Sequence, residues 1–434
     1  MSHVRDTTAL GRDGQPASAI SAHWDTTAST LQRKMRDGSL EFTSYREVLI
    51  SKGAHSRPRV VSIPTARDRV AIKALAGVIA DLFPDSRTPM AQVRVSELVA
   101  ELGLRKYDSF VRVDVKDFYP SIDHRAIRTK LRSRVRQSQL LTLVMRAIST
   151  PTVSLKSAKP IHSNLYGVPQ GLSISNLLAE VAMLDVDGAF TRRSGISYFR
   201  YVDDILVLCS STETQAIFDE LKKSCAGIGL AVHEIHEGSK SQLGALSESF
   251  EYLGYKFHPG GVSVREQSVR KLENTIAHLF TAYKYQVALN SSDEWLRKAT
   301  EALVRRLDLV IAGCVFDQIP RGWLQYFSQM DDMTLLSRLD AFVLRMARRF
   351  DVPPSFRSKS FVRAYWHIAK PNATTRKYIP DFGRFNDVDQ REFLVALFPS
   401  QNFRHLTEIE LEKRFKAEVR RLVSMLERDV SETS

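Results

Sequence analysis

Two adjacent carboxylates, Asp203 and Asp204, interrupt a run of residues that otherwise favours β structure. The flanking segments 198–200 and 205–208 are rich in aromatic and β-branched residues, as a buried strand should be. Ionised carboxylates are costly to bury unpaired, so a hairpin turn that presents both at one sheet edge resolves the conflict. Such a pair offers hard oxygen ligands to a divalent metal ion. The alternative is an ordinary Asp-containing turn, which explains the two residues equally well when they are taken alone.

A third carboxylate, Asp114, ends a predicted strand over residues 110–113. If that strand lies beside the hairpin, Asp114 and Asp203 can share two metal ions. Nucleotidyl transfer uses one such ion to lower the pKa of an attacking 3′-hydroxyl, and a second to hold the triphosphate and steady the leaving oxygen. Two ions about 4 Å apart repel each other, so several carboxylates must compensate for their charge.

The elements around these carboxylates mix helices and strands irregularly, which indicates an α+β fold rather than a doubly wound sheet. The sequence predicts a basic strand and turn over 59–69, helices over 70–83, 95–104, 126–148, 173–186 and 212–229, an extended segment over 149–166 and a strand over 230–236. From about Arg265 the chain is expected to be almost entirely helical, with a capping box at Thr407 and Glu410 before the last helix. Residues 1–30 are expected to be loosely ordered, and residues 429–434 frayed.

Charge and cysteine content narrow the class of protein. The net charge of +13 and the pI near 9.6 favour a polyanionic partner such as nucleic acid over a merely basic soluble protein. Cys209, Cys225 and Cys314 form no pattern typical of a zinc site or a disulfide framework, which fits a reducing compartment. There is no signal-peptide pattern and no apolar run of membrane-spanning length, so we expect a cytoplasmic location without membrane contact.

Six segments, in the right order along the chain, resemble the sequence motifs of reverse transcriptases. The resemblance covers residues 55–260. The segments are a fingers motif at 59–69, motif A in Val113-Asp-Val-Lys-Asp-Phe-Tyr-Pro-Ser-Ile122, motif B in Gly167-Val-Pro-Gln-Gly-Leu-Ser-Ile-Ser-Asn176, motif C in Tyr201-Val-Asp-Asp204, motif D at 229–240 and the primer-grip motif E at 250–255.

The resemblance implies a right-hand polymerase fold, with fingers, a palm built on an antiparallel sheet and a helical thumb, followed by an α-helical C-terminal region. The implied segments are an N-terminal extension (1–55), fingers (56–110), palm (111–260), a helical, maturase-like thumb (261–350) and the C-terminal region (351–434). For Arg321 to Phe327, the alternative to a nucleic-acid-gripping thumb is a helical subdomain with Trp323 in its core.

By the same resemblance, Asp114, Asp203 and Asp204 are the catalytic triad. Together with Val115 they would hold two Mg²⁺ ions, with Mn²⁺ as the alternative ion. Tyr119 occupies the position of the gate against a ribose 2′-hydroxyl, which implies a preference for deoxynucleotides; the alternative is a core aromatic beside Phe118.

Further residues receive roles from the resemblance. Arg59, Arg67, Arg69, Gln170, Gly171 and Lys240 would bind the nucleotide or template, and Tyr252, Leu253 and Gly254 would form the primer grip. A solvated basic face is the alternative for the arginines. Asp117 and Asp123 are interpreted as surface or capping residues.

Two positions depart from the family pattern. Asn176 stands where many relatives have proline, and Val202 where alanine is frequent in bacterial relatives. We expect an altered loop geometry at Asn176 and no loss of catalysis, because neither change removes a ligand.

The chain is most similar to free-standing bacterial reverse transcriptases, including those of retrons and antiphage defence, because it shows no Cys- and His-rich endonuclease region and no RNase H-like acidic cluster. We therefore expect cDNA synthesis from dNTPs on a dedicated noncoding RNA, in antiphage defence. Alternatives are a template-independent or protein-primed DNA polymerase, for which Tyr365 and Tyr378 are example priming residues, a retron or group II intron-type enzyme or RNA-binding maturase, and an RNA-dependent RNA polymerase. A homo-oligomer or a partner protein is also left open.

Overall fold

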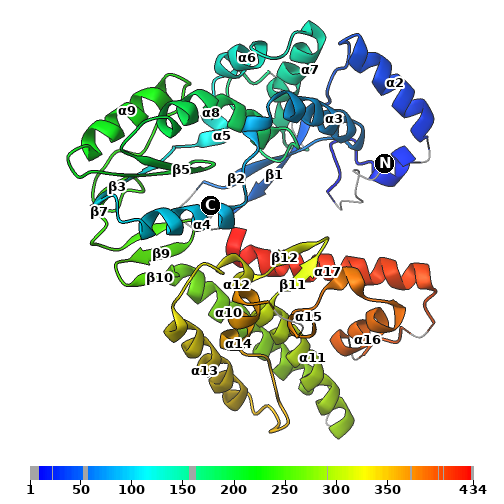
Figure 1. Cartoon of the computed structure of the whole chain (residues 1–434). Coiled ribbons are helices and arrows are strands. Elements are labelled where there is room, and N and C mark those ends of the chain that lie inside the picture. The colour runs from blue at the N-terminus through cyan, green and yellow to red at the C-terminus, as the bar shows by residue number, and fades with distance from the viewer. Residues whose placement is uncertain are drawn as a thin grey trace. The chain divides into compact units, whose positions relative to one another are not determined.

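In the computed structural model, the described residues are 9–21, 23–51, 57–155, 163–290, 292–371, 374–398, 400–403 and 405–431. They pack into two compact units (Figure 1). Unit 1 comprises residues 1–90 and 105–245, and unit 2 comprises residues 91–104 and 246–434. Packing thus divides the predicted palm segment at residue 245, and the parts of the predicted N-terminal extension at 1–8 and 52–55 lie outside the described residues.

The centre of unit 1 is a four-stranded antiparallel sheet with the strand order β5-β6-β3-β7. Its strands are β3 (Ser109–Asp114), β5 (Ser197–Tyr201), β6 (Asp204–Cys209) and β7 (Gln242–Ala245). Strand β6 is buried along its whole length, which explains its uninterrupted apolar sequence after Asp204. The predicted strand at 110–113 and the predicted hairpin are therefore confirmed.

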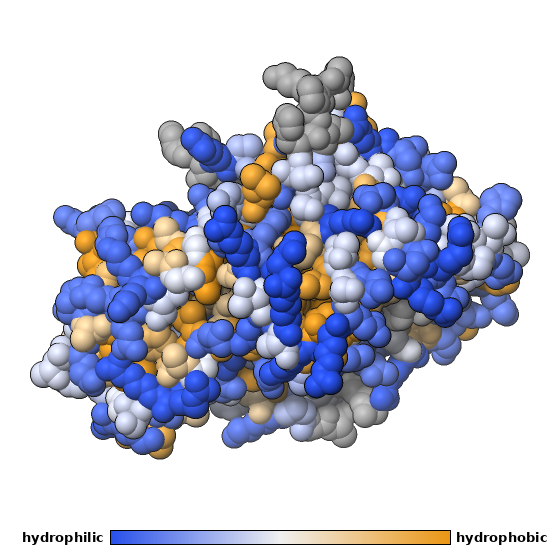
Figure 2. Space-filling view, turned by 90° about the horizontal axis from the view of Figure 1, so that it is seen from above, coloured by the Kyte–Doolittle hydropathy of each residue, from blue (hydrophilic) through white to orange (hydrophobic). Residues whose placement is uncertain are grey.

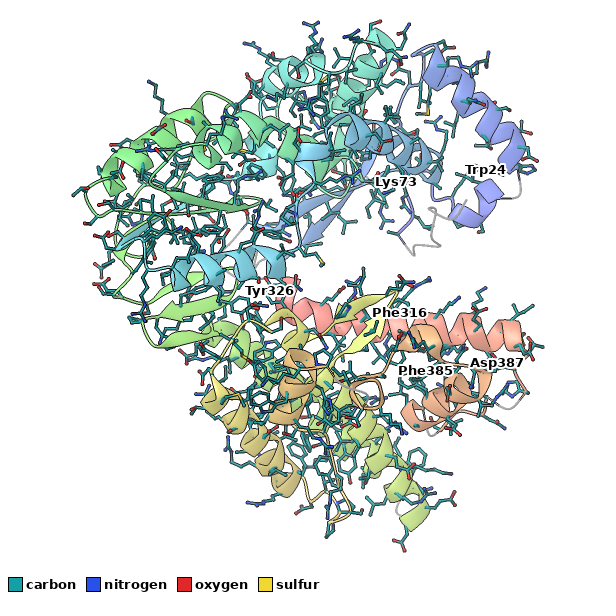
Figure 3. All side chains as sticks on the ribbon, in the orientation of Figure 1. Trp24, Lys73, Phe316, Tyr326, Phe385 and Asp387 are labelled. Carbon is teal, nitrogen blue, oxygen red and sulfur yellow. The ribbon has the colours of Figure 1, made fainter. Side chains whose placement is uncertain are left out.

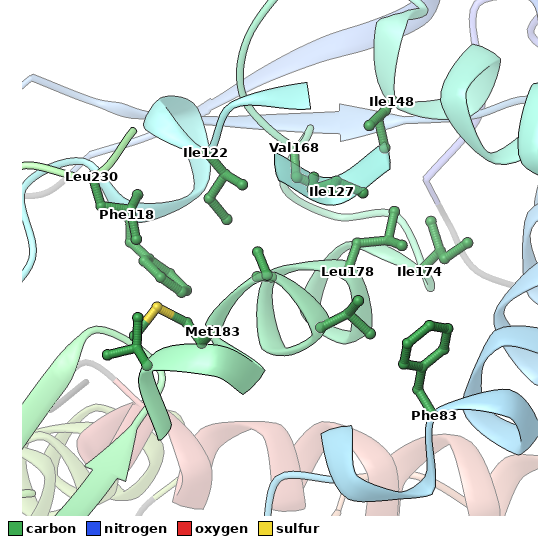
Figure 4. Packing of buried hydrophobic residues seen from close by; sticks show 14 of the residues in the cluster. Phe83, Phe118, Ile122, Ile127, Ile148, Val168, Ile174, Leu178, Met183 and Leu230 are labelled. Atoms are coloured by element: carbon green, nitrogen blue, oxygen red, sulfur yellow. The ribbon is translucent and has the colours of Figure 1, made fainter. Parts of the chain in front are cut away.

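Helices cover this sheet and form the core of unit 1. Helices α8 (Ser175–Thr191) and α9 (Thr214–Ala226) contact β5 and β3, and Figure 1 shows them on one face of the sheet. Figure 4 shows part of the core, with Leu178 and Met183 of α8 facing side chains from other segments. Apolar side chains of this kind are the main source of stability, at about 1.5–3 kcal/mol for each one fully buried.

A second sheet in unit 1 has the strand order β2-β1-β4. Strands β1 (Tyr45–Ile50) and β2 (Arg59–Ile63) are antiparallel, and β4 (Thr152–Val153) runs parallel to β1. Helix α3 (Ala66–Leu82) follows β2 directly because Thr65 caps it, accepting a hydrogen bond from the backbone N–H of Asp68. The short 3-10 helix η1 (Pro84–Ser86) follows α3.

The predicted long helix over 126–148 is wrong. The chain forms two helices, α6 (His124–Arg132) and α7 (Ser138–Ser149), separated by a turn. In that turn, Arg134 donates hydrogen bonds to the Leu82 carbonyl oxygen (3.0 Å) and the Asp85 carboxylate (2.7 Å). These tertiary contacts override a helical propensity that is unbroken by glycine or proline.

Two other expectations for unit 1 are also wrong. Residues 230–236 form no strand but a single bridge between Val232 and Val115, because the backbone of this segment pairs only with the end of β3. Within residues 9–30, the loosely ordered lead-in is replaced by helix α1 (Ala17–Ser21) and the start of α2 (Trp24–Arg36), which buries Leu31. Helix α5 (Phe118–Ser121) completes this unit. Of the expected extended segment 149–166, residues 156–162 lie outside the described part of the chain.

Unit 2 is mainly helical but contains two small sheets, which corrects the expectation of helices alone after Arg265. Strands β8 (Phe250–Tyr252), β9 (Tyr255–His258) and β10 (Gly261–Val264) form one sheet, and β11 (Cys314–Phe316) and β12 (Ile319–Arg321) form a hairpin. That hairpin turns at Asp317 and Gln318, both of which have positive φ. The helices are α4 (Ala91–Gly103), α10 (Glu266–Val287), α11 (Asp293–Ala312), α12 (Trp323–Tyr326), α13 (Met333–Arg349), α14 (Phe361–Ala369), α15 (Thr375–Tyr378), the 3-10 helix η2 (Phe382–Arg384), α16 (Asp387–Leu397) and α17 (Glu408–Ser431).

The core of unit 2 contains Trp323, which is 1% exposed and packs against Phe327 with ring centroids 4.8 Å apart. Figure 3 labels Tyr326 and Phe316 in the same unit. The packed alternative for Trp323 is therefore correct. The predicted capping box is confirmed, since the Thr407 backbone N–H donates to Glu410 and the Glu410 N–H donates to the Thr407 hydroxyl. Helix α17 continues to Ser431, so the expected fraying at 429–434 is not seen at 429–431, and residues 432–434 lie outside the described part of the chain.

The three cysteines are free and buried, so the prediction of no disulfide is confirmed. No helix within the described ranges is both long and apolar enough to cross a membrane. Figure 2 shows that hydrophilic residues cover most of the displayed face, with hydrophobic residues between them.

Candidate active site

The turn between β5 and β6 consists of Val202 and Asp203, since Tyr201 and Asp204 are the last paired residues of the two strands. Val202 has φ 58°, a left-handed conformation that β-branched residues rarely adopt. A positive φ at the first position of a two-residue hairpin turn matches the right-handed twist of the strands. The turn therefore presents Asp203 at the end of the sheet at a cost in backbone strain.

Strand β3 brings Asp114 to the same end of the sheet. Asp114 lies directly opposite Asp204 in the antiparallel register of β3 and β6. The chain then stays attached to the hairpin, because the Val115 N–H donates a hydrogen bond to the Asp203 carbonyl oxygen (3.1 Å). The expectation that the strand ending at Asp114 lies beside the hairpin is confirmed.

The carboxylates influence one another electrostatically. Burial, together with the negative charge of Asp114, raises the pKa of Asp203 to about 6. Burial also raises the pKa of Asp204, and the neighbouring Arg112 opposes that shift. Asp114 Oδ2 lies 3.4 Å from Lys240 Nζ and 3.3 Å from His233 Nε2, so cationic or proton-bearing groups surround it.

Arg112 was not identified from the sequence as a site residue. Its Nε and Nη2 atoms donate to the two Asp204 carboxylate oxygens, both at 2.9 Å, in the bidentate geometry that arginine favours. The signal was its position two residues before Asp114, which places both on the same face of β3. Asp204 is thereby held by a cation of the protein itself.

The donor set fits a divalent cation at Asp114 and Asp203, since two hard carboxylates that repel each other are brought together there. Asp204 is oriented toward Arg112 instead. In the part of the chain that the structure describes, no three Asp, Glu, His or Cys side chains are grouped closely enough to hold a metal ion. The structure therefore brings the three carboxylates to one sheet end but joins them into no closed ligand cage.

A buried ionic network supports the hairpin. Arg200, the residue before Tyr201, is 7% exposed and donates to the Val202 carbonyl oxygen (2.9 Å). Its guanidinium also pairs with Glu180 and Asp187 of α8, both at 2.6 Å. Sequence reasoning treated Arg200 only as a strand residue. The available signal was a charge within an apolar strand. The predicted helix ended at 186 and so contained Glu180 but not Asp187, which lies on the same helix in the structure.

Tyr119 lies near the carboxylates. Burial raises its pKa to about 12, with further contributions from the charges of Glu180 and Asp203. Its ring is half-buried and stands edge-on to Phe118, with centroids 5.4 Å apart. Its hydroxyl donates to Asn176 Oδ1 (2.9 Å). The ring thus packs beside Phe118, as the core interpretation expects, and the role of Tyr119 as a gate stays a prediction.

Gln170 and Gly171 belong to a loop that packs against β2. The Gln170 carbonyl oxygen accepts a hydrogen bond from the Ser62 N–H (2.7 Å). Gly171 has φ 103°, and a Cβ there would lie 2.9 Å from the Ser62 carbonyl oxygen. The position therefore requires glycine, for its backbone conformation and for the close approach of β2.

The predicted cationic residues differ in their surroundings. Arg59 is exposed at the start of β2, and its charge lowers the pKa of Tyr119, so it lies within electrostatic range of that ring. Arg67 pairs with Asp68 (2.6 Å) and donates to the Glu41 carbonyl oxygen (3.0 Å).

Arg69 donates to the Ala9 carbonyl oxygen. The structure thus brings Lys240 beside Asp114 and Arg59 within electrostatic range of Tyr119. Arg67 and Arg69 make contacts elsewhere in unit 1. Their role in nucleotide binding stays a prediction.

The predicted primer grip, Tyr252 to Gly254, belongs to unit 2. Tyr252 and Leu253 are 0% and 1% exposed, and the turn of the β8–β9 hairpin is formed by Leu253 (φ 48°) and Gly254 (φ 79°). Tyr326 Oη donates to the Leu253 carbonyl oxygen (3.1 Å). These side chains stabilise the hairpin, and their contact with a primer stays a prediction.

The two acidic residues interpreted as surface or capping groups have distinct positions. Asp123 caps α6, since its side chain accepts a hydrogen bond from the Arg125 N–H (2.7 Å). Asp117 is exposed before α5 with φ 42° and makes no side-chain cap. The interpretation of both residues is confirmed.

Unit 1 thus has a mixed α/β fold, in which an antiparallel sheet carries carboxylates at one end and helices on one face. Residues 50–257 match the protein family described as reverse transcriptase (RNA-dependent DNA polymerase). This part of the chain is therefore similar to reverse transcriptase domains.

The chain is similar to solved structures of telomerases. Apo telomerase from Candida tropicalis shares 14% identity over 95% of this chain and 70% of that chain, with a TM-score of 0.44. Its form truncated from the C-terminal domain shares 15% over 56% of this chain and 60% of that chain, with a TM-score of 0.41. Telomerase from Candida albicans in complex with a TWJ fragment of telomeric RNA shares 12% sequence identity. The match covers 87% of this chain and 66% of that chain, with a TM-score of 0.41.

The chain thus spans 60% and 66% of the length of the truncated and the RNA-bound telomerase. A comparison with curated proteins finds no match.

Proposed function

We propose that this protein is an RNA-directed DNA polymerase that extends a primer with dNTPs by two-metal nucleotidyl transfer. The supporting observation is the strand register that sets Asp114 opposite Asp204 and attaches Val115 to Asp203, within a segment similar to reverse transcriptase domains. Mg²⁺ is the proposed ion and Mn²⁺ the alternative, since both accept carboxylate oxygens.

In the proposed mechanism, Asp114 and Asp203 would hold the divalent ions, and the Val115 carbonyl would be a further candidate ligand. When bound, the ions supply the positive charge that lowers the pKa of a primer 3′-hydroxyl and offsets charge on the leaving pyrophosphate. Arg200 keeps the turn in place through the Val202 carbonyl oxygen. Lys240, 68% exposed and beside Asp114, is positioned to neutralise phosphate charge.

Deoxynucleotides are the proposed substrates because of Tyr119. Its half-buried ring lies within the electrostatic influence of Asp203, where a ribose 2′-hydroxyl would meet its face. Substituting Tyr119 by Ala is expected to relax the choice of sugar. An RNA-dependent RNA polymerase would show no such change.

We further propose that the template is a dedicated noncoding RNA and that the protein acts in antiphage defence in the cytoplasm. The net charge of +13 supports a nucleic-acid partner, and the free cysteines fit a reducing compartment. The protein-primed alternative receives no support from its example tyrosines. Tyr365 Oη donates to the Met330 carbonyl oxygen (2.8 Å), and Tyr378 Oη accepts from the Ser360 N–H (3.0 Å).

The decisive experiment is primer extension on an RNA template with purified protein. Asp203→Ala and Asp114→Ala should each reduce the rate by about a thousandfold, because several kcal/mol of charge stabilisation are lost. Asp219→Asn, an exposed carboxylate on α9, is the matched control and should keep wild-type activity. Equal rates for the wild type and Asp203→Ala would contradict the proposal and favour the maturase alternative.

Sequencing the RNA and DNA that co-purify with the protein tests the template. One abundant RNA with complementary DNA is expected, and DNA without a complementary template would favour template-independent synthesis. A phage challenge of cells that carry the wild type or Asp203→Ala tests the defence role. Equal phage titres in both would contradict it.

A further inference from the structure

We infer that Asn176 is a specificity-determining positioning residue, which fixes the Tyr119 ring so that the site rejects ribonucleotides. The inference rests on the proposed function. In the sequence, Asn176 departs from the family pattern, and an altered loop geometry is the expected consequence. That expectation stays a prediction, and the structure adds a hydrogen bond between Asn176 and Tyr119, which stand 57 positions apart in the chain.

The backbone at Asn176 is part of an α-helix. Helix α8 begins at Ser175, and Ser175 is 3% exposed and donates from its hydroxyl to the Pro169 carbonyl oxygen. Asn176 is therefore the second residue of a helix whose first turn is anchored to the preceding loop. The difference from a proline at this position lies in the side chain, because proline has neither an acceptor nor a donor to offer Tyr119.

The Asn176 amide links two segments of unit 1. Its Oδ1 accepts from the Tyr119 hydroxyl at 2.9 Å, and its Nδ2 lies 3.5 Å from Thr88 Oγ1. The amide can contact both hydroxyls in either orientation, since each hydroxyl can donate or accept. Thr88 thus lies at the end of the amide opposite its contact with Tyr119.

Tyr119 is consequently held at both ends of its side chain. The ring stands edge-on to Phe118 at an interplanar angle of 68°, and the hydroxyl is tied to Asn176. A ring restrained only by Phe118 could tilt about its Cα–Cβ bond and leave room for a 2′-hydroxyl. Because the exclusion is steric, a small displacement of the ring is enough to weaken it.

The test is the ratio of kcat/KM for dGTP to that for GTP in primer extension. This ratio cancels effects on triphosphate binding and on folding, which are common to both nucleotides. Asn176→Leu and Tyr119→Phe should each lower it about three- to tenfold, as the loss of one hydrogen bond of ordinary net strength implies. The double variant should fall no further than either single variant, because both remove the same bond.

Asn176→Asp is the matched control, since it retains the acceptor and should stay within about twofold of the wild-type ratio. Thr88→Ala should produce a smaller decrease than Asn176→Leu. An unchanged ratio in Asn176→Leu, or additive decreases in the double variant, would overturn the inference. Thermal unfolding of each variant checks folding, and the exposed position of Asn176 predicts only a small shift in Tm.

The outcomes separate this inference from the proposed function. If Asp203→Ala extends a primer as fast as the wild type does, both the polymerase assignment and this inference are overturned. Normal extension with an unchanged ratio in Asn176→Leu overturns only the inference about Asn176. A lowered ratio in Tyr119→Ala, with an unchanged ratio in Asn176→Leu, would leave Tyr119 as the gate and remove Asn176 from it.

Discussion

At the scale of single residues, the site brings together carboxylates whose negative charges repel each other. Asp203 is held close to the negative charge of Asp114, on a turn whose first residue, Val202, has positive φ. Asp114 also repels Asp204, and the ion pair of Asp204 with Arg112 opposes that repulsion. The repulsion between the carboxylates lowers the stability of the folded protein when no cation is bound, and it favours the binding of a cation. Such a loss of stability is common at functional sites.

The Asp203 carboxyl predicts a pH-dependent stability. Its pKa is raised from 3.8 to about 6 in the folded protein, so the folded state binds this proton more tightly than the unfolded state. The stabilisation is full below about pH 4 and is lost as pH rises through about 6. Asp203→Asn should therefore raise the free energy of unfolding of the metal-free protein by about 1–2 kcal/mol at pH 8.

This gain should vanish near pH 4, and denaturant unfolding at both pH values measures it. Saturating Mg²⁺ should stabilise the wild type more than Asp203→Asn. A gain of equal size at both pH values would show that the asparagine acts by some route other than lost charge.

At the scale of elements, the hairpin and helix α8 act as one body. Arg200 joins them, since it donates to the turn through Val202 and pairs with Glu180 and Asp187 on the helix. Helix α8 also carries Asn176 in its first turn, so the same helix supports the carboxylate turn and the Tyr119 contact. A displacement of α8 would disturb both.

Replacing Arg200 tests this coupling. Arg200→Gln should destabilise the protein by about 3–5 kcal/mol, because the buried Glu180 and the half-buried Asp187 lose their partner. It should also lower kcat more than it raises KM for dNTPs, since the turn moves but nucleotide contacts remain. The control is Arg193→Gln, whose ion pairs with Glu213 and Glu220 are more exposed and are worth about 1 kcal/mol or less. An Arg200→Gln variant with an unaltered kcat at a temperature where it is folded would rule out a positioning role.

At the scale of the whole molecule, the excess of positive charge is the dominant property. The chain carries 62 Lys and Arg residues against 49 Asp and Glu residues. Many of these cations are paired on the helices of unit 2, for example Arg297 with Glu301. The surplus favours a polyanion through long-range attraction and counterion release, independently of its sequence.

Binding to an RNA–DNA primer-template should therefore depend steeply on salt. If about six to ten phosphates are contacted, affinity should fall by about 10³–10⁵ between roughly 50 and 200 mM salt. Fluorescence anisotropy with a labelled duplex measures the slope of log K against log salt. A flat dependence would mean that few phosphates are contacted, contrary to the charge argument.

Local sequence patterns by themselves determined which residues form the carboxylate hairpin, the strand ending at Asp114 and helix α8, because these depend on the spacing of apolar residues along the chain. They also carried the family motifs. The tertiary structure alone decided which side chains meet: Arg112 with Asp204, Arg200 with Glu180, and Tyr119 with Asn176. It also broke the predicted helix at Arg134, whose partners precede it by about fifty residues. Periodicity reports which face of an element is buried, whereas the partner of a polar group is set by how distant segments pack.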